Sequence, residues 1–358
     1  MIIYLINYFL IFVLYFFTKH IKHGKKIFLF LTFFIMWCIV VLRWNIGVDY
    51  QNYNRIYSQV ITSNLFEAFQ IIEPGYAILI YFSNILFPNN VWFMHFIVGT
   101  ITMIFFYLAI KKISPSYFLS VYIFVSINFF YSMMNQERQF LALSIVAYSL
   151  YYLINKKDKL KFIILILIAM TFHYSSIVCL LLLLPNYISK FKYKKILFSI
   201  CILFLFIIIL NLEKILYGTS YGRYFNSYYD NQLQISVILN TFVRLFISIP
   251  IYYFYRKYKM KFKKCEVLFH MFFFMMFFQI CSLASSVFGR LTTYFFAAII
   301  FIIPIIIDNI KFKMNKKVIN KIIIFIIVLL FIPYHFIYFQ IQSESMGVNQ
   351  YISIFETK

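Results

Sequence analysis

The sequence predicts an all-α, polytopic integral membrane protein. Of its 358 residues, 63% are hydrophobic and only 12% are charged, whereas soluble domains carry roughly 25% charged residues. The mean hydropathy is +0.85, and the apolar residues form runs of the length that crosses a bilayer as a helix, about 20 residues. This composition excludes a soluble enzyme, a disordered chain and a nucleic-acid-binding protein, in spite of the formal net charge of +22.

The apolar runs give the expected elements in chain order. The candidate spans are 2–17, 26–42, 91–110, 117–134, 138–154, 160–185, 196–210, 235–255, 266–288, 291–307 and 322–339. The first is expected to be a retained span, because no basic residue precedes it and no small-residue cleavage site follows it. We therefore expect a single transmembrane domain over residues 1–358, with about 10–12 transmembrane helices.

The lysines set the topology of these spans. Six clusters hold 24 of the 26 lysines: Lys19–Lys26, Lys111–Lys112, Lys156–Lys161, Lys190–Lys195, Lys257–Lys264 and Lys311–Lys321. Lysine clusters beside spans mark the cytoplasmic side of a membrane protein. The chain must therefore cross the membrane an even number of times between any two clusters.

Two segments are adjusted by this parity rule. Segment 74–88 would break it by crossing, so we expect a re-entrant or outer interfacial segment. Segment 160–185 would break it by crossing once, and it carries a polar interruption at Thr171–Ser176. Two half-helices that meet at this interruption restore the parity. Because non-helical backbone at membrane depth must be satisfied by protein or water, His173 in the break is expected to face a polar cavity.

The outer face then receives residues 43–73 and 211–234 as loops and residues 340–358 as a tail. Of the seven arginines, only Arg256 belongs to a lysine cluster; the others are Arg43, Arg55, Arg138, Arg223, Arg244 and Arg290. Arginine binds phosphate or carboxylate through two parallel hydrogen bonds, so these six predict an anionic ligand. The alternative is structural pairing with acidic residues: Asp49, Glu67, Glu73, Glu137, Glu213 and Asp230.

The densest polar cluster follows the second span and reads Arg43-Trp44-Asn45-Ile46-Gly47-Val48-Asp49-Tyr50-Gln51-Asn52-Tyr53. Aromatic faces beside carboxylate and amide groups are the surfaces that sugar rings bind. The alternative is an interfacial aromatic belt with Asp49 as a helix cap.

Glu73, in Glu73-Pro74-Gly75-Tyr76, opens the segment that is not expected to cross. Its carboxylate either orients a hydroxyl, pairs with an arginine, or is only a helix N-terminal charge. Arg138 begins a span within Asn135–Gln139, where a cation is unfavourable for the helix dipole and favourable for a bound anion. Glu137 is the expected balancing charge.

His173 is the one histidine at apparent membrane depth with polar neighbours on both sides, whereas His95 lies near a span end. Imidazole titrates near neutrality and suits proton transfer; the alternative is a structural histidine. Arg290 and Tyr294 are four residues apart and share a helix face. Arg223 lies in a tyrosine-rich outer loop, and Arg244 lies within a span, where a charge needs a cavity or a partner.

No cofactor is expected. No His, Cys or acidic cluster has metal-binding spacing, and no GxxxxGK[ST] nucleotide loop is present.

Taken in order, the motifs resemble those of the EpsG family, the Wzy-type polymerases of capsule, O-antigen and exopolysaccharide synthesis. The matching residues are Arg43-xxx-Gly47-x-Asp49-Tyr50-xx-Tyr53, Glu73-x-Gly75-Tyr76, Arg138-Gln139-xx-Ala142, Phe172-His173-Tyr174-Ser175 and Arg290-xxx-Tyr294. The resemblance implies a metal-independent glycosyltransferase of the bacterial cytoplasmic membrane. Such an enzyme transfers a growing glycan from undecaprenyl diphosphate to a hydroxyl of an incoming lipid-linked repeat at the outer face.

The resemblance also implies residue roles. The expected diphosphate-binding residues are Arg138, Arg244, Arg290 and Arg223. The expected catalytic residues are His173, Asp49, Arg138 and Arg290, with either His173 or Asp49 as the base for the acceptor hydroxyl. The expected sugar-binding residues are Arg43, Tyr50, Tyr53, Glu73 and Tyr294.

Expected partners are undecaprenyl-diphosphate-linked oligosaccharides, membrane lipid, a chain-length regulator and a flippase, with no nucleic acid. Three rival functions are a lipid-linked oligosaccharide flippase or other transporter, an O-antigen-ligase-like glycosyltransferase and a membrane acyltransferase. A flippase should expose its arginines to both faces and show internal symmetry, and the sequence shows neither. A ligase usually has an outer loop larger than 211–234, and an acyltransferase should pair a histidine with an acidic residue at acyl-acceptor spacing.

Overall fold

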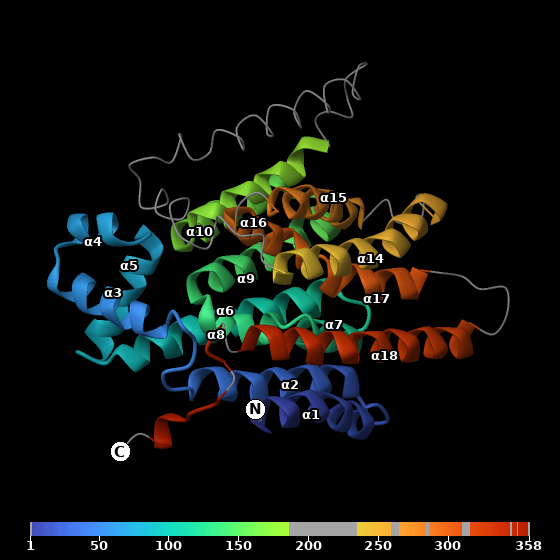
Figure 1. Ribbon diagram of the computed structural model, residues 1–358, viewed down its shortest axis with the longest axis horizontal. Coiled ribbons are helices and arrows are strands. Elements are labelled where there is room, and N and C mark those ends of the chain that lie inside the picture. The colour runs from blue at the N-terminus through green and yellow to red at the C-terminus, as the bar shows by residue number, and fades with distance from the viewer. Residues whose placement is uncertain are drawn as a thin grey trace. The chain divides into compact units, whose positions relative to one another are not determined.

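The computed structural model describes residues 2–185, 235–258, 265–283, 286–309, 316–343, 346–348 and 350–356 (Figure 1). Within these ranges the chain is helical, and its only β-type pairing is an isolated bridge between Arg43 and Ser353. The predicted all-α class is confirmed. The chain divides into two compact units, Met1–Ile177 with Ile299–Lys358, and Val178–Ala298.

The helices of the first unit are α1 (Ile2–Thr18), α2 (Gly24–Val41), α3 (Tyr50–Thr62), α4 (Leu65–Ile71), α5 (Pro74–Leu86), α6 (Val91–Ile113), α7 (Tyr117–Ser126), α8 (Phe129–Asn135), α9 (Glu137–Tyr151), the π-helical η1 (Tyr152–Lys156), α10 (Lys159–Phe172), α17 (Ile299–Asn309) and α18 (Lys316–Ser343). The 3-10 helix η2 (Tyr174–Leu183) follows α10 and runs into the second unit, which contains α14 (Ile235–Tyr258), α15 (Glu266–Cys281) and α16 (Ser286–Phe296). The expected span at 196–210 and the loop at 211–234 lie outside the described residues.

Several helices have the length and apolar character of membrane spans. In the described ranges, Gly24–Val41, Val91–Ile113 and Val287–Asn309 qualify, and a bent pair, Tyr117–Ser126 with Phe129–Asn135, is a fourth candidate. Shorter apolar helices accompany them at Tyr4–Thr18, Pro74–Leu86, Tyr174–Leu183, Glu266–Cys281 and Ile323–Ile337. This set of helices is that of a multi-pass membrane protein.

Two spans are broken by identifiable residues. The break expected at His173 is confirmed: α10 ends at Phe172, and His173 is extended, with φ −157 and ψ 111. The segment expected as one span over 117–134 instead bends by 50° between α7 and α8. Asn128 causes this bend, because its φ of 61 is left-handed, a conformation that asparagine tolerates better than most residues.

The helices of the first unit place lysines and candidate site residues at opposite ends. Neighbours α2 and α6, α6 and α9, and α9 and α10 pack against each other. The helix α6 begins near His95 and ends with Lys111 and Lys112 in its last turn. Helix α9 also begins at the end with site residues, at Glu137, and leads to Lys156. Helix α10 runs the other way: it begins at Lys159 and ends beside His173. We call the end with His95 and Glu137 the arginine end.

The short helices α3, α4 and α5 gather at this arginine end (Figure 1). Tyr53, Tyr57 and Val60 of α3 pack on Tyr76 and Ile80 of α5 in a buried apolar cluster. Because α5 begins beside residues of the arginine end and leads directly into the start of α6, it does not cross to the lysine end. This geometry agrees with the predicted re-entrant or interfacial segment near 74–88, whose place in the membrane stays a prediction.

Close packing of α5 on α10 depends on Gly75. A Cβ atom at this position would lie 2.9 Å from the backbone oxygen of Thr171 and would also clash with the Thr171 hydroxyl. We expect Gly75→Ala to lower the free energy of unfolding by about 1–3 kcal/mol, the usual cost of overpacking. The measurement is thermal unfolding of the purified protein in detergent.

The matched control is Gly289→Ala in α16, where an added Cβ meets nothing within 4 Å. In a helix this change is neutral or stabilising. An equal melting temperature for the Gly75 variant and the wild type would contradict the packing described.

The C-terminal tail lies on the loop that follows α2. Backbone N–H groups of Trp44, Gly47 and Val48 donate to Ile352, Gly347 and Met346, at 2.9, 2.9 and 3.0 Å. The tail also donates from Ile354 to the carbonyl of Leu42 at 2.9 Å. The tail therefore reaches the arginine end and holds the loop that contains Arg43 and Asp49.

Candidate functional site

A buried carboxylate, that of Glu73, joins three of the predicted site residues. It is 2% exposed. Nη1 of Arg138 donates to Oε2 of Glu73 at 2.5 Å, and Nδ1 of His173 lies 3.1 Å from Oε1. These partners are 65 and 100 residues away in sequence. We call Glu73, Arg138 and His173 the Glu73 cluster.

Local structure positions each member of this cluster. Glu73 is the residue before α5, with Pro74 at the first helical position, where proline is favoured because its missing N–H is not needed. Arg138 is in the first turn of α9, and His173 occupies the break after α10. Side chains at helix ends from three parts of the chain thus converge at the arginine end.

The electrostatics of the cluster keep Glu73 ionised. Glu73 lies in the connection before α5, outside the spans. Burial by itself raises the pKa of its carboxyl group, but the hydrogen bond from His173 and the charges of Arg138 and His173 outweigh burial and lower the pKa to about 2. An ionised carboxylate only accepts hydrogen bonds, so the imidazole donates from Nδ1, and Nε2 is the basic nitrogen when the ring is neutral.

The Arg138 guanidinium also contacts an aromatic face. Its central carbon lies 5.7 Å from the centre of the Tyr53 ring, within the range of a cation–π interaction. The Arg138 side chain remains 20% exposed. Arg138 is therefore the member of the Glu73 cluster that is most accessible from outside the protein.

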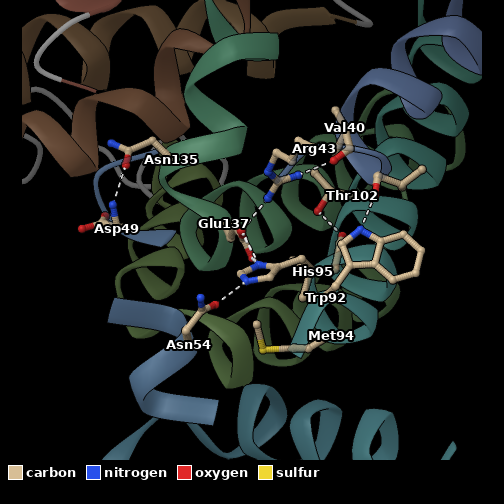
Figure 2. A network of polar contacts seen from close by, with 12 residues as sticks. Val40, Arg43, Asp49, Asn54, Trp92, Met94, His95, Thr102, Asn135 and Glu137 are labelled. Carbon is tan, nitrogen blue, oxygen red and sulfur yellow. Dashed lines mark hydrogen bonds and ion pairs between the residues drawn. The ribbon is translucent and has the colours of Figure 1, made fainter. Parts of the chain in front are cut away.

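A second buried network surrounds Glu137 (Figure 2). Nη2 of Arg43 donates to Oε1 of Glu137 at 2.5 Å, and Nδ1 of His95 lies 2.7 and 2.9 Å from the two carboxylate oxygens. The far side of the imidazole, Nε2, lies 2.9 Å from Oδ1 of Asn54. Tyr50 stacks on His95 with 4.1 Å between ring centres. Arg43 and His95 are each 1% exposed, and Glu137 is 2% exposed.

Adjacent residues of α9, Glu137 and Arg138, belong to different networks. These two residues do not pair with each other. Glu137 was expected to balance Arg138, but the counter-ion of Arg138 is Glu73, and Glu137 binds Arg43 and His95. Successive helical residues point about 100° apart, so adjacent residues meet different partners. Tyr76, three residues after Glu73, contacts the second network through its hydroxyl, which lies 3.5 Å from Oε2 of Glu137.

Asp49 lies at the start of α3 and makes no side-chain cap to that helix. Its backbone N–H donates to Oδ1 of Asn135 at 3.0 Å, as Figure 2 shows. Gly47 allows this approach, because its φ is +105 and a Cβ there would lie 2.7 Å from the carbonyl of Met134. A helix cap thus does not explain Asp49, and its role as a base stays a prediction.

Of the predicted sugar-binding residues, Arg43, Tyr50, Tyr53 and Glu73 come together at the arginine end, and each is at most 3% exposed. Tyr294, which is also buried, and Arg244 and Arg290 belong to the second unit. Arg223 lies outside the described residues. The roles of these residues in binding sugar or diphosphate stay predictions.

Sequence reasoning missed the importance of His95, Asn54 and Asn135. The available signal was His95 itself, a polar residue one turn inside an apolar span, since buried polar residues in spans need partners. Within the described ranges, no three His, Cys, Asp or Glu side chains gather as metal ligands would.

Comparison with known proteins agrees with these motifs. A profile of the EpsG family matches residues 26–353, a range that contains both buried networks, α14–α16 and most of the C-terminal tail. No curated protein and no solved structure matches the chain. EpsG family members are Wzy-like polysaccharide polymerases. The resemblance of the motifs is confirmed, and the chain belongs to the EpsG family.

Proposed function

We propose that this protein polymerises oligosaccharide repeats, transferring the growing glycan from undecaprenyl diphosphate to a hydroxyl of the incoming lipid-linked repeat. The reaction takes place at the outer face of the bacterial cytoplasmic membrane. The observation that carries the proposal is the Glu73 cluster, a buried Glu–His pair with an arginine on the same carboxylate, in a chain of a polymerase family.

The distribution of charge supports the proposed outer location. Lysine clusters favour the cytoplasm, and the Glu73 cluster lies at the opposite end of α9 and α10 from Lys156 and Lys159. The helix α6 has 23 residues and is about 34 Å long at 1.5 Å per residue, which is enough to cross a hydrocarbon layer of about 30 Å. This length supports the proposal that its ends lie on opposite sides of the membrane, with the arginine end outside.

The chemistry is a substitution at the anomeric carbon of the donor sugar. The oxygen of the acceptor hydroxyl forms a bond to this carbon, the bond from the carbon to the diphosphate oxygen breaks, and the diphosphate leaves on its lipid. The hydroxyl proton passes to Nε2 of His173. Glu73 holds the ring through Nδ1 and stabilises the imidazolium that forms, as a carboxylate does for a catalytic histidine elsewhere.

The leaving diphosphate gains negative charge as the bond breaks. Arginines stabilise such charge through fixed hydrogen-bond donors, and in this proposal Arg138, Arg223, Arg244 and Arg290 supply it without a metal. A flippase that delivers repeats to the outer face and a chain-length regulator are the partners that a polymerase of this kind needs.

His173→Ala tests the role of the cluster. We expect loss of polymer and accumulation of single lipid-linked repeats, because general-base catalysis contributes roughly 10²–10⁴-fold to the rate. The measurement is the size distribution of lipid-linked glycans in membranes that contain equal amounts of each variant. His20→Ala is the control, since His20 is exposed in the connection between α1 and α2.

A strain without the protein separates the rival functions. Single repeats exposed outside support polymerisation, repeats trapped on the cytoplasmic side indicate a flippase, and long lipid-linked glycans that fail to reach a second acceptor indicate a ligase. Normal chain lengths in the His173 variant at normal membrane levels would refute the proposed role of the cluster.

A further inference from the structure

The second unit contains an arginine, Arg244, whose contacts among the described residues are neutral groups. Arg244 lies in α14, nine residues after Ile235 and thirteen before Lys257. Its Nη1 donates to Oε1 of Gln279, and its guanidinium lies 4.7 Å from the centre of the Phe296 ring. The Nε atom is buried without a hydrogen-bond partner among the described residues.

The orientation of Gln279 is fixed by two hydroxyl groups. Its Nε2 donates to Oγ1 of Thr241 at 2.7 Å and to Oγ of Ser282 at 3.1 Å. Both hydroxyls already donate their own protons to backbone carbonyls, Thr241 to Val237 at 2.8 Å and Ser282 to Gln279 at 2.6 Å. They can therefore only accept from Gln279. The amide must point its NH₂ group at the hydroxyls and its carbonyl oxygen at Arg244.

No carboxylate in the described part of this unit neutralises Arg244. The acidic residue there is Glu266, which accepts a hydrogen bond from the Tyr255 hydroxyl at 2.9 Å. The contacts 244–279 and 255–266 show that α14 and α15 run antiparallel. Tyr255 is eleven residues from Arg244, so Glu266 lies roughly 16 Å farther along the helix pair.

Arg244 thus differs in its surroundings from Arg43 and Arg138 of the first unit. In the first unit, Arg43 binds Glu137 and Arg138 binds Glu73, so the charge of each is already balanced. Arg244 is held by an amide, which aims the guanidinium without cancelling its charge. A cation inside a span is costly unless an opposite charge joins it, so the ligand is expected to bring that charge.

We infer that Gln279 orients Arg244 within the proposed diphosphate site and leaves the charge of Arg244 for the diphosphate of the lipid carrier. Gln279 is a positioning residue: it acts through Arg244 and keeps the site cationic. This inference rests on the proposed function, which already assigns Arg244 to the diphosphate, and it adds the residue that orients the Arg244 guanidinium.

Two substitutions at Gln279 separate an anion site from a structural contact. Gln279→Glu keeps the shape and the hydrogen bond to Arg244 but adds a negative charge, whereas Gln279→Leu removes the hydrogen bond and leaves the cation unbalanced. For an anion site, affinity should fall in the order wild type, Gln279→Leu, Gln279→Glu. A purely structural contact gives the opposite order for the two variants, because an ion pair replaces the amide contact in Gln279→Glu.

The experiment measures binding of undecaprenyl diphosphate to the full-length protein in nanodiscs of neutral phosphatidylcholine. We expect Gln279→Glu to weaken binding by roughly tenfold or more, which corresponds to about 1.4 kcal/mol, with a melting temperature at or above that of the wild type. The matched control is Gln59→Glu, the same change at an exposed position of α3, which should bind as the wild type does.

Binding by Gln279→Glu that equals or exceeds that of Gln279→Leu would overturn the inference. So would equal competition by phosphatidylglycerol, because the site would then bind any anionic lipid headgroup. Failure of the proposed function shows itself separately, as normal polymer in a strain without the protein, while the order of diphosphate affinities is measured on the purified protein.

Discussion

Replacing Glu73 by glutamine is expected to stop polymer formation and to leave single lipid-linked repeats in the membrane. The substitution keeps the size of the side chain and removes one negative charge. His173 then loses the carboxylate that accepts from Nδ1, and Arg138 loses its counter-ion. We expect the rate of polymerisation to fall by roughly 10²–10⁴-fold, the usual contribution of a positioned general base.

The assay compares the ratio of polymer to single repeats in membranes with equal amounts of wild type and variant. Glu67→Gln is the matched control, because Glu67 is exposed in the first turn of α4 and caps that helix together with Asn64. Glutamine preserves such a capping box, so this variant should keep normal activity. Polymer of normal length from the Glu73 variant would exclude an essential carboxylate in the cluster.

Loss of activity in the Glu73 variant is distinguishable from unfolding. Arg138 stays 20% exposed and lies over the Tyr53 ring, so water and an aromatic face still stabilise part of its charge. The melting temperature should therefore fall less in this variant than in variants of the fully buried Glu137 network.

Replacing Arg43 by alanine is expected to give the largest loss of stability among single substitutions of the described site residues. The side chains of Arg43 and Glu137 are each 1% exposed, and removal of one partner leaves the other charge buried. Breaking a buried ion pair in this way costs about 3–5 kcal/mol. The measurement is the free energy of unfolding of the purified protein in detergent.

The control is Arg55→Ala, since Arg55 is exposed and donates a hydrogen bond to Oδ1 of Asn52 in its own helix at 2.9 Å. Surface substitutions of this kind change stability by about 0.5 kcal/mol or less. A double-mutant cycle with Arg43→Met and Glu137→Gln should show a double variant less destabilised than the sum of the single variants, because neither charge is then left alone. Additive losses would mean that the pair does not stabilise the fold.

Several features of the fold follow from the sequence because they depend on local composition. Apolar runs predict spans wherever they occur, and lysine clusters predict the side on which each span ends. The break at His173 was visible as a polar interruption in an apolar segment, and parity required it. The bend at Asn128 was missed, since a single asparagine in an apolar run does not by itself signal a left-handed residue.

The candidate site was predicted in part. Arg43, Glu73, Arg138 and His173 were singled out because charged and polar residues are costly beside or within spans and need a reason to be there. The pairing alternative for the arginines holds for Arg43 and Arg138, each of which has a carboxylate partner. Arg244 instead contacts Gln279 and Phe296, and in our proposal the ligand balances its charge.

The sequence by itself determined the class of the protein, and it predicts the polarity of its spans and the residues that carry chemistry. The hydrophobicity of a segment and the number of lysines beside it are sums over residues that are close in sequence. Both can therefore be calculated from the sequence without the fold. Only the tertiary structure decided which charged groups pair with each other. Glu73 binds Arg138 and His173, which are 65 and 100 positions away. Glu137 binds Arg43 and His95 and not the adjacent Arg138. An ion pair requires contact within a few ångströms, and that contact depends on how the helices pack rather than on the spacing of residues in the sequence.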